Sequence, residues 1–171
     1  MVDMEILTYP DSRLKQECEA VDSFDEELAR FITELDTFMR SQPGGIGIAA
    51  PQVGRLQRIC IVDLTGMTRG KKKRPVPNQG RMVLVNPEIT EWDGFELGRE
   101  GCMSVPDYTG NVIRATQIKF AAQDESGELH EYESEGYEAR AIQHEVDHLD
   151  GMLFLDRLVS RRTDLFQRKK R

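Results

Sequence analysis

AIQHEVDHLDG, residues 141–151, contains two histidines and a glutamate in the pattern H-E-x-x-H. Side chains four positions apart lie on one face of a helix, so His144 and His148 can bind the same metal ion. Glu145 between them can reach a water on that ion and act as a general base. The chain has three histidines, and this stretch contains two of them. The pattern predicts a metal-binding helix over about residues 137–150, ended by Gly151.

Composition indicates an ordinary globular protein. The chain has 171 residues, of which 31% are charged and 39% hydrophobic, which predicts a single domain over residues 1–171. No apolar run approaches the roughly 20 residues of a membrane span, and the first residues lack a secretory pattern. The three cysteines form no C-x-x-C pair, which is typical of free thiols in a reducing compartment. We therefore expect neither membrane insertion nor disulfides.

Charge is unevenly distributed along the chain. The net charge is −7, yet the tail at about 157–171 carries seven basic residues against the single acid Asp164. Such a tail can contact a polyanion such as RNA, although a solvated, frayed chain end is the more common interpretation. A second basic cluster, RGKKKR at 69–74, runs into PVPN, and this composition predicts a mobile surface loop between two strands.

The remaining pattern predicts an α+β fold. Apolar residues at helical spacing over 24–39 predict an amphipathic helix, with Ser23 and Glu26 as a capping box and Pro43-Gly44-Gly45 as its end. Strands are predicted at 58–64, 82–85, 112–123 and 128–132, the last two joined by a turn at Ser126-Gly127. We expect mostly antiparallel β-sheets packed around a central helix bearing H-E-x-x-H, with the amphipathic helix near the N-terminus as the second helix.

We expect the third metal ligand upstream of the helix. No glutamate follows Glu145, and Phe154 occupies the position at which one class of H-E-x-x-H proteases has a third histidine. Cys102 lies in GREGCMSVP (98–106), where glycine and proline mark an irregular backbone that can present a thiol. From the residues alone it is one open candidate among several. The others are His130, read as a surface strand residue; Cys60, read as core; Cys18, read as partly exposed; and the carboxylates.

The glycine-rich run GGIGIAAPQVG at 44–54 allows close approach of the backbone to another group. It lacks the lysine of a P-loop and the spacing of a dinucleotide fingerprint. The run is compatible with a strand edge that pairs with an extended peptide, with Gln52 as a hydrogen-bond donor. A tight loop packed on a helix is the alternative.

Three segments taken together resemble the peptide deformylase family. They are GIGIAAPQVG at 45–54, EGCMSVP at 100–106 and QHEVDHLDG at 143–151, and ILTYPDSRL at 6–14 is similar to the entry segment of that family. Two departures are Met103, where leucine is usual, and Glu138, where an apolar residue is common. The resemblance covers nearly the whole chain.

The resemblance implies removal of the formyl group from formyl-methionine at the start of newly made polypeptides, with release of formate by a metal-activated water. It implies one divalent ion, usually Fe(II), with Zn(II), Ni(II) or Co(II) as substitutes, and a bacterial cytoplasm. The metal ligands would be Cys102, His144 and His148. The general base would be Glu145, and the oxyanion donors would be the Gln52 amide and the Met103 backbone N–H. The substrate would be bound by Gly47, Ile46, Tyr137 and Ala141.

Two other classes of protein remain open at this point. A zinc endopeptidase would carry the same helix, but the absence of a downstream ligand argues against it. A structural metal domain would need a fourth protein ligand, such as His130 or Cys18. We expect a monomer whose partners are nascent formyl-methionyl polypeptides, with transient ribosome contact through the basic C-terminal tail.

Overall fold

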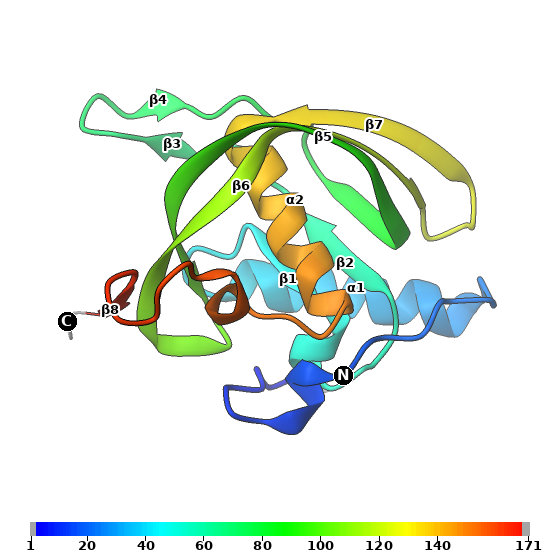
Figure 1. Ribbon diagram of the computed structural model, residues 1–171. Coiled ribbons are helices and arrows are strands. Elements are labelled where there is room, and N and C mark those ends of the chain that lie inside the picture. Colours follow the sequence, from blue (N-terminus) through cyan, green and yellow to red (C-terminus); the bar gives the residue numbers. More distant parts are fainter. Residues whose placement is uncertain (1–2, 169–171) are drawn as a thin grey trace.

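The computed structural model describes residues 3–168, which form two α-helices, three short 3₁₀ helices and eight strands (Figure 1). The helices are α1 (Glu26–Ser41), α2 (Gly136–Leu149), η1 (Ser12–Lys15), η2 (Ala50–Val53) and η3 (Phe154–Arg157). The strands are β1 (Gly47–Ala49), β2 (Ile59–Val62), β3 (Thr68–Arg69), β4 (Arg74–Pro75), β5 (Met82–Cys102), β6 (Val105–Gln123), β7 (Leu129–Glu135) and β8 (Leu165–Gln167).

One antiparallel sheet dominates the molecule. Its strand order is β1-β2-β5-β6-β7, with β8 added to β6, and every pairing is antiparallel. The long strands β5, β6 and β7 arch around α2, which lies at the centre of the molecule (Figure 1). The predicted α+β fold with a central H-E-x-x-H helix is therefore confirmed.

Strand β2 is buried on both faces. Cys60 and Val62 belong to an apolar cluster with residues of α2, whereas Ile59 and Ile61 belong to a cluster with residues of α1. Side chains alternate between the two faces of a strand, so a strand between two helices needs apolar residues at every position. The unbroken apolar run in the sequence follows from this central position, and α1 is scaffold rather than part of the site.

Helix α1 begins two residues later than the predicted capping box. The cap is Asp25, whose side chain accepts a hydrogen bond from the Leu28 backbone N–H at 2.9 Å. The box of Ser23 and Glu26 is wrong, because Asp25 serves equally well as an N-cap and lies directly before the first helical residue. The helix ends at Ser41, immediately before the predicted Pro43-Gly44-Gly45 stop.

Strand β5 is much longer than predicted. The sequence predicted a strand at 82–85 and an irregular backbone at 98–106, yet β5 continues to Cys102, and two residues connect it to β6. Register shifts near 85–91 and at 101–102 interrupt the pairing, and most side chains of 88–99 are exposed. Because the pairing is interrupted and most of these side chains face solvent, the sequence of this segment lacks the alternation of apolar and polar residues by which a strand is recognised. Cys102 is therefore presented by the end of a strand.

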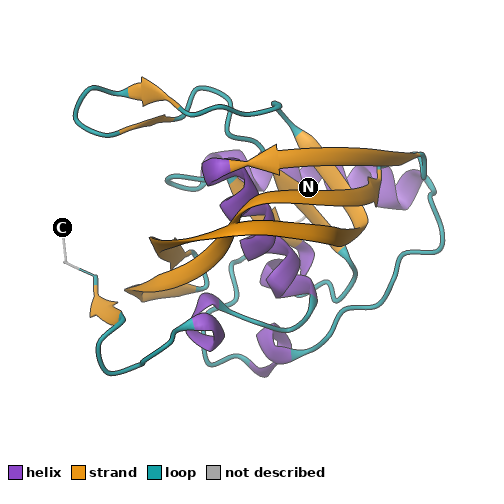
Figure 2. Ribbon diagram, turned by 45° about the horizontal axis from the view of Figure 1, so that its top comes forward, coloured by secondary structure: helices purple, strands orange, loops and turns teal. Residues whose placement is uncertain are grey.

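The two basic segments adopt more structure than predicted. Residues 69–74 lie on the exposed β3–β4 hairpin, which stands apart from the main sheet (Figure 2). In the C-terminal tail, Leu165–Gln167 pairs with β6, so the prediction of a frayed end is wrong there. The part of that tail beyond 168 lies outside the described residues. Within residues 3–168, neither α-helix has the length and apolar character needed to cross a membrane.

Candidate metal centre

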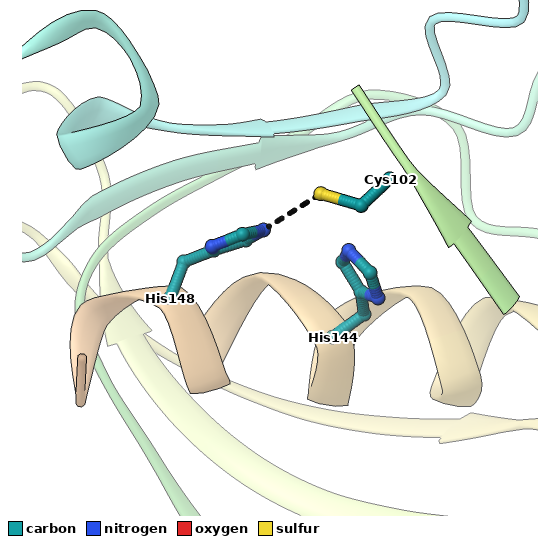
Figure 3. A group of neighbouring side chains, drawn as sticks. All are labelled: Cys102, His144 and His148. Carbon is teal, nitrogen blue, oxygen red and sulfur yellow. Dashed lines mark hydrogen bonds between the residues drawn. The ribbon is translucent and has the colours of Figure 1, made fainter. Parts of the chain in front are cut away.

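The three predicted ligands converge at one point between α2 and the end of β5 (Figure 3). His144 and His148 lie one turn apart on α2, and the thiol of Cys102 faces both. One ligand atom from each of the three residues lies within 4.8 Å of the other two. Nε2 of His148 is 3.4 Å from Sγ of Cys102. The structure therefore brings together a group separated by more than forty residues in sequence.

The donor set fits a borderline or soft divalent metal ion. Metal–nitrogen and metal–sulfur bonds of about 2.0–2.3 Å at tetrahedral angles separate neighbouring ligand atoms by roughly 3.5 Å. The 3.4 Å between His148 and Cys102 matches that spacing. A thiolate with two imidazoles suits iron, zinc, nickel or cobalt better than magnesium or calcium. These three residues form a Cys-His-His metal site.

Glu100 orients the first histidine. Nδ1–H of His144 donates to Oε1 of Glu100 at 2.8 Å, which leaves Nε2 of that ring for the metal. Glu100 also accepts two hydrogen bonds from Arg114, at 2.8 and 2.9 Å, and one from Arg140 at 2.7 Å. Arg114 reaches on to Asp147 of α2. A carboxylate that accepts from a ligating histidine fixes the tautomer and the direction of the ring.

Sequence reasoning missed this buried ion network. A signal was present, because Glu100 and Asp147 both lie inside the quoted motifs, at EGC and HEVDH. Burial alone would raise the pKa of Glu100, but hydrogen bonds from Arg114 and His144 outweigh it and hold that pKa well below its usual range. Burial opposes the charge of Arg114, yet Glu100 and Asp147 raise its pKa. The network is therefore charged and internally paired.

Glu145 lies beside the three ligands with part of its carboxylate unused. The side chain is buried, and Oε1 has no hydrogen-bond partner among the described residues. Burial raises the pKa of Glu145 to about 7. A Cβ at position 47 would lie 2.6 Å from Oε2 of Glu145, so Gly47 leaves the space that this carboxylate occupies. The glycine in β1 is thus explained by the close approach of the helix.

Gln52 points its amide donor at the same centre. Oε1 of Gln52 accepts from the Ala49 backbone N–H at 3.0 Å, and Nε2 donates to Oγ of Ser104 at 3.1 Å. Nε2 also lies 3.6 Å from Sγ of Cys102. These contacts hold the amide with its N–H groups towards the metal ligands. Ser104 was not predicted, although it lies two residues after Cys102 in the quoted motif.

A cavity of about 560 Å³ opens onto the centre. Its walls include the residues predicted to bind the substrate and those predicted to hold the oxyanion, whereas His148 lies beneath the surface. Predicted residues on the wall are Ile46, Gly47, Gln52, Cys102, Met103, Tyr137, Ala141, His144 and Glu145. The wall also contains Arg140 and Arg168, which sequence reasoning did not select.

A larger cavity of about 640 Å³ lies elsewhere and contains none of the metal ligands. Glu138 lines it, and the Glu138 carboxylate accepts from the backbone N–H and the side chain of Gln79 and from the Ser134 hydroxyl. Glu138 therefore faces away from the metal centre, and its buried charge is fully hydrogen-bonded. Glu138 does not line the cavity at the metal centre.

The other ligand candidates lie away from the centre. His130 is on β7 and pairs with Asp124 near the surface, at 2.8 Å. Cys60 is fully buried in the core, as predicted. Cys18 is 6% exposed, so the prediction that it is partly exposed is wrong; its backbone N–H donates to the Leu149 carbonyl, which draws it against the end of α2. Among residues 3–168, the group at the centre contains three protein ligands and no fourth.

Known proteins are similar to this chain over nearly their whole length. Residues 3–164 match the family described as polypeptide deformylase. A peptide deformylase of Thermodesulfovibrio yellowstonii is 38% identical over 169 residues, covering 99% of this chain and 97% of the relative. The crystal structure of peptide deformylase from Thermotoga maritima has a TM-score of 0.82 at 35% identity, covering 94% of this chain and 100% of that one. A Met-Ala-Ser-bound class I type b peptide deformylase from Acinetobacter baumannii also has a TM-score of 0.82, at 35% identity, covering 92% and 99%.

Proposed function

The chain belongs to the polypeptide deformylase family and is a metal-dependent hydrolase with peptide deformylase activity; on that premise, we propose that it removes formate from the formyl-methionine of newly made polypeptides. One observation carries the proposal. The unpaired carboxylate oxygen of Glu145 lies beside the Cys-His-His centre at a cavity open to a peptide. The alternative of a structural metal domain lacks the fourth ligand that a closed site requires.

We assign proton transfer to Glu145. A divalent ion held by Cys102, His144 and His148 would supply a Lewis acid, which would polarise the formyl carbonyl and make water acidic near neutral pH. Oε1 of Glu145 is free to accept that proton, and the same carboxyl then delivers it to the nitrogen of the departing amine. Gly47 has no side chain, and this leaves the space that Oε2 of the Glu145 carboxylate occupies. Glu145 is the carboxylate suited to proton transfer, because the other buried carboxylates near the ligands are paired with arginine.

We assign stabilisation of the oxyanion to Gln52 and Met103. The Gln52 amide is fixed by Ala49 and Ser104, so its donor costs little reorganisation during the reaction. Met103 follows the ligand Cys102 directly and lines the same cavity, and its backbone N–H supplies the second donor. The methionine side chain in place of the usual leucine does not change that N–H. Losing one such donor typically costs about 3 kcal/mol of transition-state stabilisation.

We propose that the peptide binds along β1. This strand pairs with β2 on one side and ends the strand order of the described sheet, so its other edge is available for a further strand. Ile46 and Gly47 lie at that edge, and Tyr137 and Ala141 of α2 complete an apolar wall for the methionine side chain. The related enzyme solved with Met-Ala-Ser supports a peptide ligand of this kind.

We further propose Fe(II) as the ion in the cell, in a reducing bacterial cytoplasm. The three free cysteines and the bacterial sources of the similar deformylases from Thermodesulfovibrio yellowstonii and Thermotoga maritima support this compartment. A thiolate ligand makes an iron site sensitive to oxidation, which favours a reducing environment. We propose that residues 1–171 work as one catalytic domain and as a monomer, since one chain supplies the whole site. Ribosome contact through the basic tail stays a prediction.

Purification without oxygen, followed by metal analysis and a formate-release assay, tests the function. We expect one metal ion per chain and release of formate from formyl-Met-Ala-Ser. An unformylated protein substrate should remain uncut, which separates deformylation from endopeptidase activity. Cleavage of internal peptide bonds without release of formate would contradict the proposal.

A further inference from the structure

We propose that Arg168 is a substrate-positioning residue, which binds a carboxylate of the peptide beyond its formyl-methionine. The inference rests on the proposed function, because it takes the cavity at the metal centre as the peptide site. Arg168 lies on the wall of that cavity, with Met103 and Pro106 on the same wall. It comes from the end of the chain, far in sequence from the catalytic motifs, and carries a positive charge in a protein of net charge −7.

The C-terminal strand holds Arg168 in position. Strand β8 pairs with β6 through Leu165, Phe166 and Gln167. The Arg168 backbone N–H donates to the Asp107 carbonyl at 2.7 Å, which extends the pairing to Arg168 itself. The guanidinium of Arg99 lies 3.7 Å from the centroid of the Phe166 ring and adds a cation–π contact. The backbone that presents Arg168 is therefore anchored to the hairpin that also presents the Cys102 ligand.

Gly101 makes room for the guanidinium. A Cβ at position 101 would lie 2.5 Å from Nη2 of Arg168, so this charged group lies against the backbone immediately before Cys102. The methyl group of Thr109 would be the next contact of such a Cβ, at 3.4 Å. The charge of Arg168 is thereby placed at the rim of the cavity, against the residue that precedes the ligand Cys102.

The two arginines of the cavity wall, Arg140 and Arg168, differ in how many of their N–H donors are free to bind a ligand. Arg140 is engaged by Glu100 at 2.7 Å and by the carbonyls of Val112 and Glu96 at 3.0 and 2.8 Å. The guanidinium of Arg168 makes no hydrogen bond or ion pair with any side chain of residues 3–168. Guanidinium groups bind carboxylates in a bidentate geometry, so an unengaged arginine at the rim favours an acidic peptide. Arg168 is the member of the pair that remains available to the substrate.

A carboxylate can come from two sources, and three formyl peptides distinguish them. Formyl-Met-Ala-Asp-amide carries only a side-chain carboxylate, formyl-Met-Ala-Ser carries only a terminal one, and formyl-Met-Ala-Ser-amide carries neither. In Arg168→Ala we expect KM to rise about 3- to 10-fold for one or both acidic peptides, with kcat unchanged and no change for the neutral amide. An increase for the aspartyl peptide assigns Arg168 to acidic side chains. An increase confined to formyl-Met-Ala-Ser assigns it to chain ends.

Arg162→Ala is the matched control, because it removes the same charge from the exposed turn before β8. Calorimetry provides a readout independent of turnover, because it measures binding of the products Met-Ala-Asp-amide and Met-Ala-Ser-amide. If Arg168 binds the aspartate side chain, Arg168→Ala should lose affinity only for Met-Ala-Asp-amide. The proposal would be overturned if Arg168→Ala and Arg162→Ala changed KM equally, if Arg168→Ala changed KM equally for all three peptides, or if it changed KM for none. If the unaltered enzyme releases formate from none of the three, the proposed function fails instead.

Discussion

Two regions of this molecule place a histidine 2.8 Å from a carboxylate, and they differ in everything around that contact. At the metal centre His144 meets Glu100, with the two side chains 12% and 5% exposed. At the β6–β7 turn His130 meets Asp124, and the corresponding values are 40% and 25%. Asp124, Glu128 and His130 are three side chains that could approach one cation, as Cys102, His144 and His148 are at the metal centre.

The two regions share residue types and a distance, and they differ in burial and in the hydrogen bonds around the carboxylate. The carboxylate at the centre is held by buried arginines and directs a ring whose other nitrogen is free. Asp124 instead accepts from the Ser126 backbone N–H and hydroxyl and from the Glu128 backbone N–H, which stabilises the turn. Water solvates the exposed group and weakens its electrostatic interactions. We therefore expect large effects of mutation at the first region and small ones at the second.

The largest expected difference is in turnover. Glu145→Ala removes the proposed general base but leaves Cys102, His144 and His148, so we expect kcat to fall by about 10²- to 10⁴-fold with metal content unchanged. Glu128→Ala, in the exposed group, should change neither quantity. Formate release and metal analysis of both variants check this. Near-normal activity of Glu145→Ala would show that the carboxylate is not the base.

The second-largest expected difference is in the metal content of two cysteine variants. Cys102→Ala removes a ligand and should lose bound metal after dialysis, whereas Cys60→Ala should retain it, because Cys60 is fully buried in the core between β2 and α2. Metal analysis of the two dialysed variants makes the test. Equal metal content would mean that the wrong thiol has been assigned.

Stability should respond to the buried carboxylate more than to the exposed one. Glu100→Ala leaves Arg114 and Arg140 without their shared partner, and breaking such a buried pair costs about 3–5 kcal/mol of the free energy of unfolding. It should also weaken metal binding by about 10- to 100-fold, because His144 loses its orienting acceptor. Urea unfolding and metal titration measure the two effects. Asp124→Asn serves as the control, and a comparable loss there would refute the distinction between the regions.

The smallest effect concerns the titration of His130. The hydrogen bond that His130 donates to the Asp124 carboxylate raises the pKa of His130, so Asp124→Asn should return that pKa towards the ordinary value of about 6.5. Because the folded pKa lies above the unfolded one, the contribution of the pair to stability is complete below the unfolded pKa. It is lost as pH rises through the folded pKa. NMR titration of the ring follows the shift, and an unchanged midpoint in Asp124→Asn would show that the contact does not form in solution.

Local patterns predicted the helices well. The i, i+4 spacing of His144 and His148 and the stop at Gly151 placed α2 within a residue at each end, and apolar spacing identified α1. The turn at Ser126-Gly127 correctly predicted the β6–β7 hairpin. Each of these features depends on contacts between residues a few positions apart, which is why sequence alone suffices.

Features that depend on distant contacts were missed or mistaken. The length of β5 was hidden because its exposed half has no apolar alternation. The network from Glu100 through Arg114 to Asp147 joins a strand end, a neighbouring strand and a helix. Two of its members lie inside the motifs, but their spacing along the chain does not predict that they pair through Arg114. Strand β8 was read as a frayed tail because a short basic segment acquires its structure only by pairing with β6.

The sequence alone establishes that a helix presents two imidazoles four positions apart, with a carboxylate directly after the first, since helical geometry is set by the local backbone. The choice of the third ligand from residue composition alone stayed open among cysteines, a histidine and acids. Tertiary structure decided it, because the β5–β6 hairpin carries Cys102 to within 3.4 Å of His148 while burying Cys60 in the core. It also decided why position 47 is glycine, since only the packed helix brings Glu145 against that backbone.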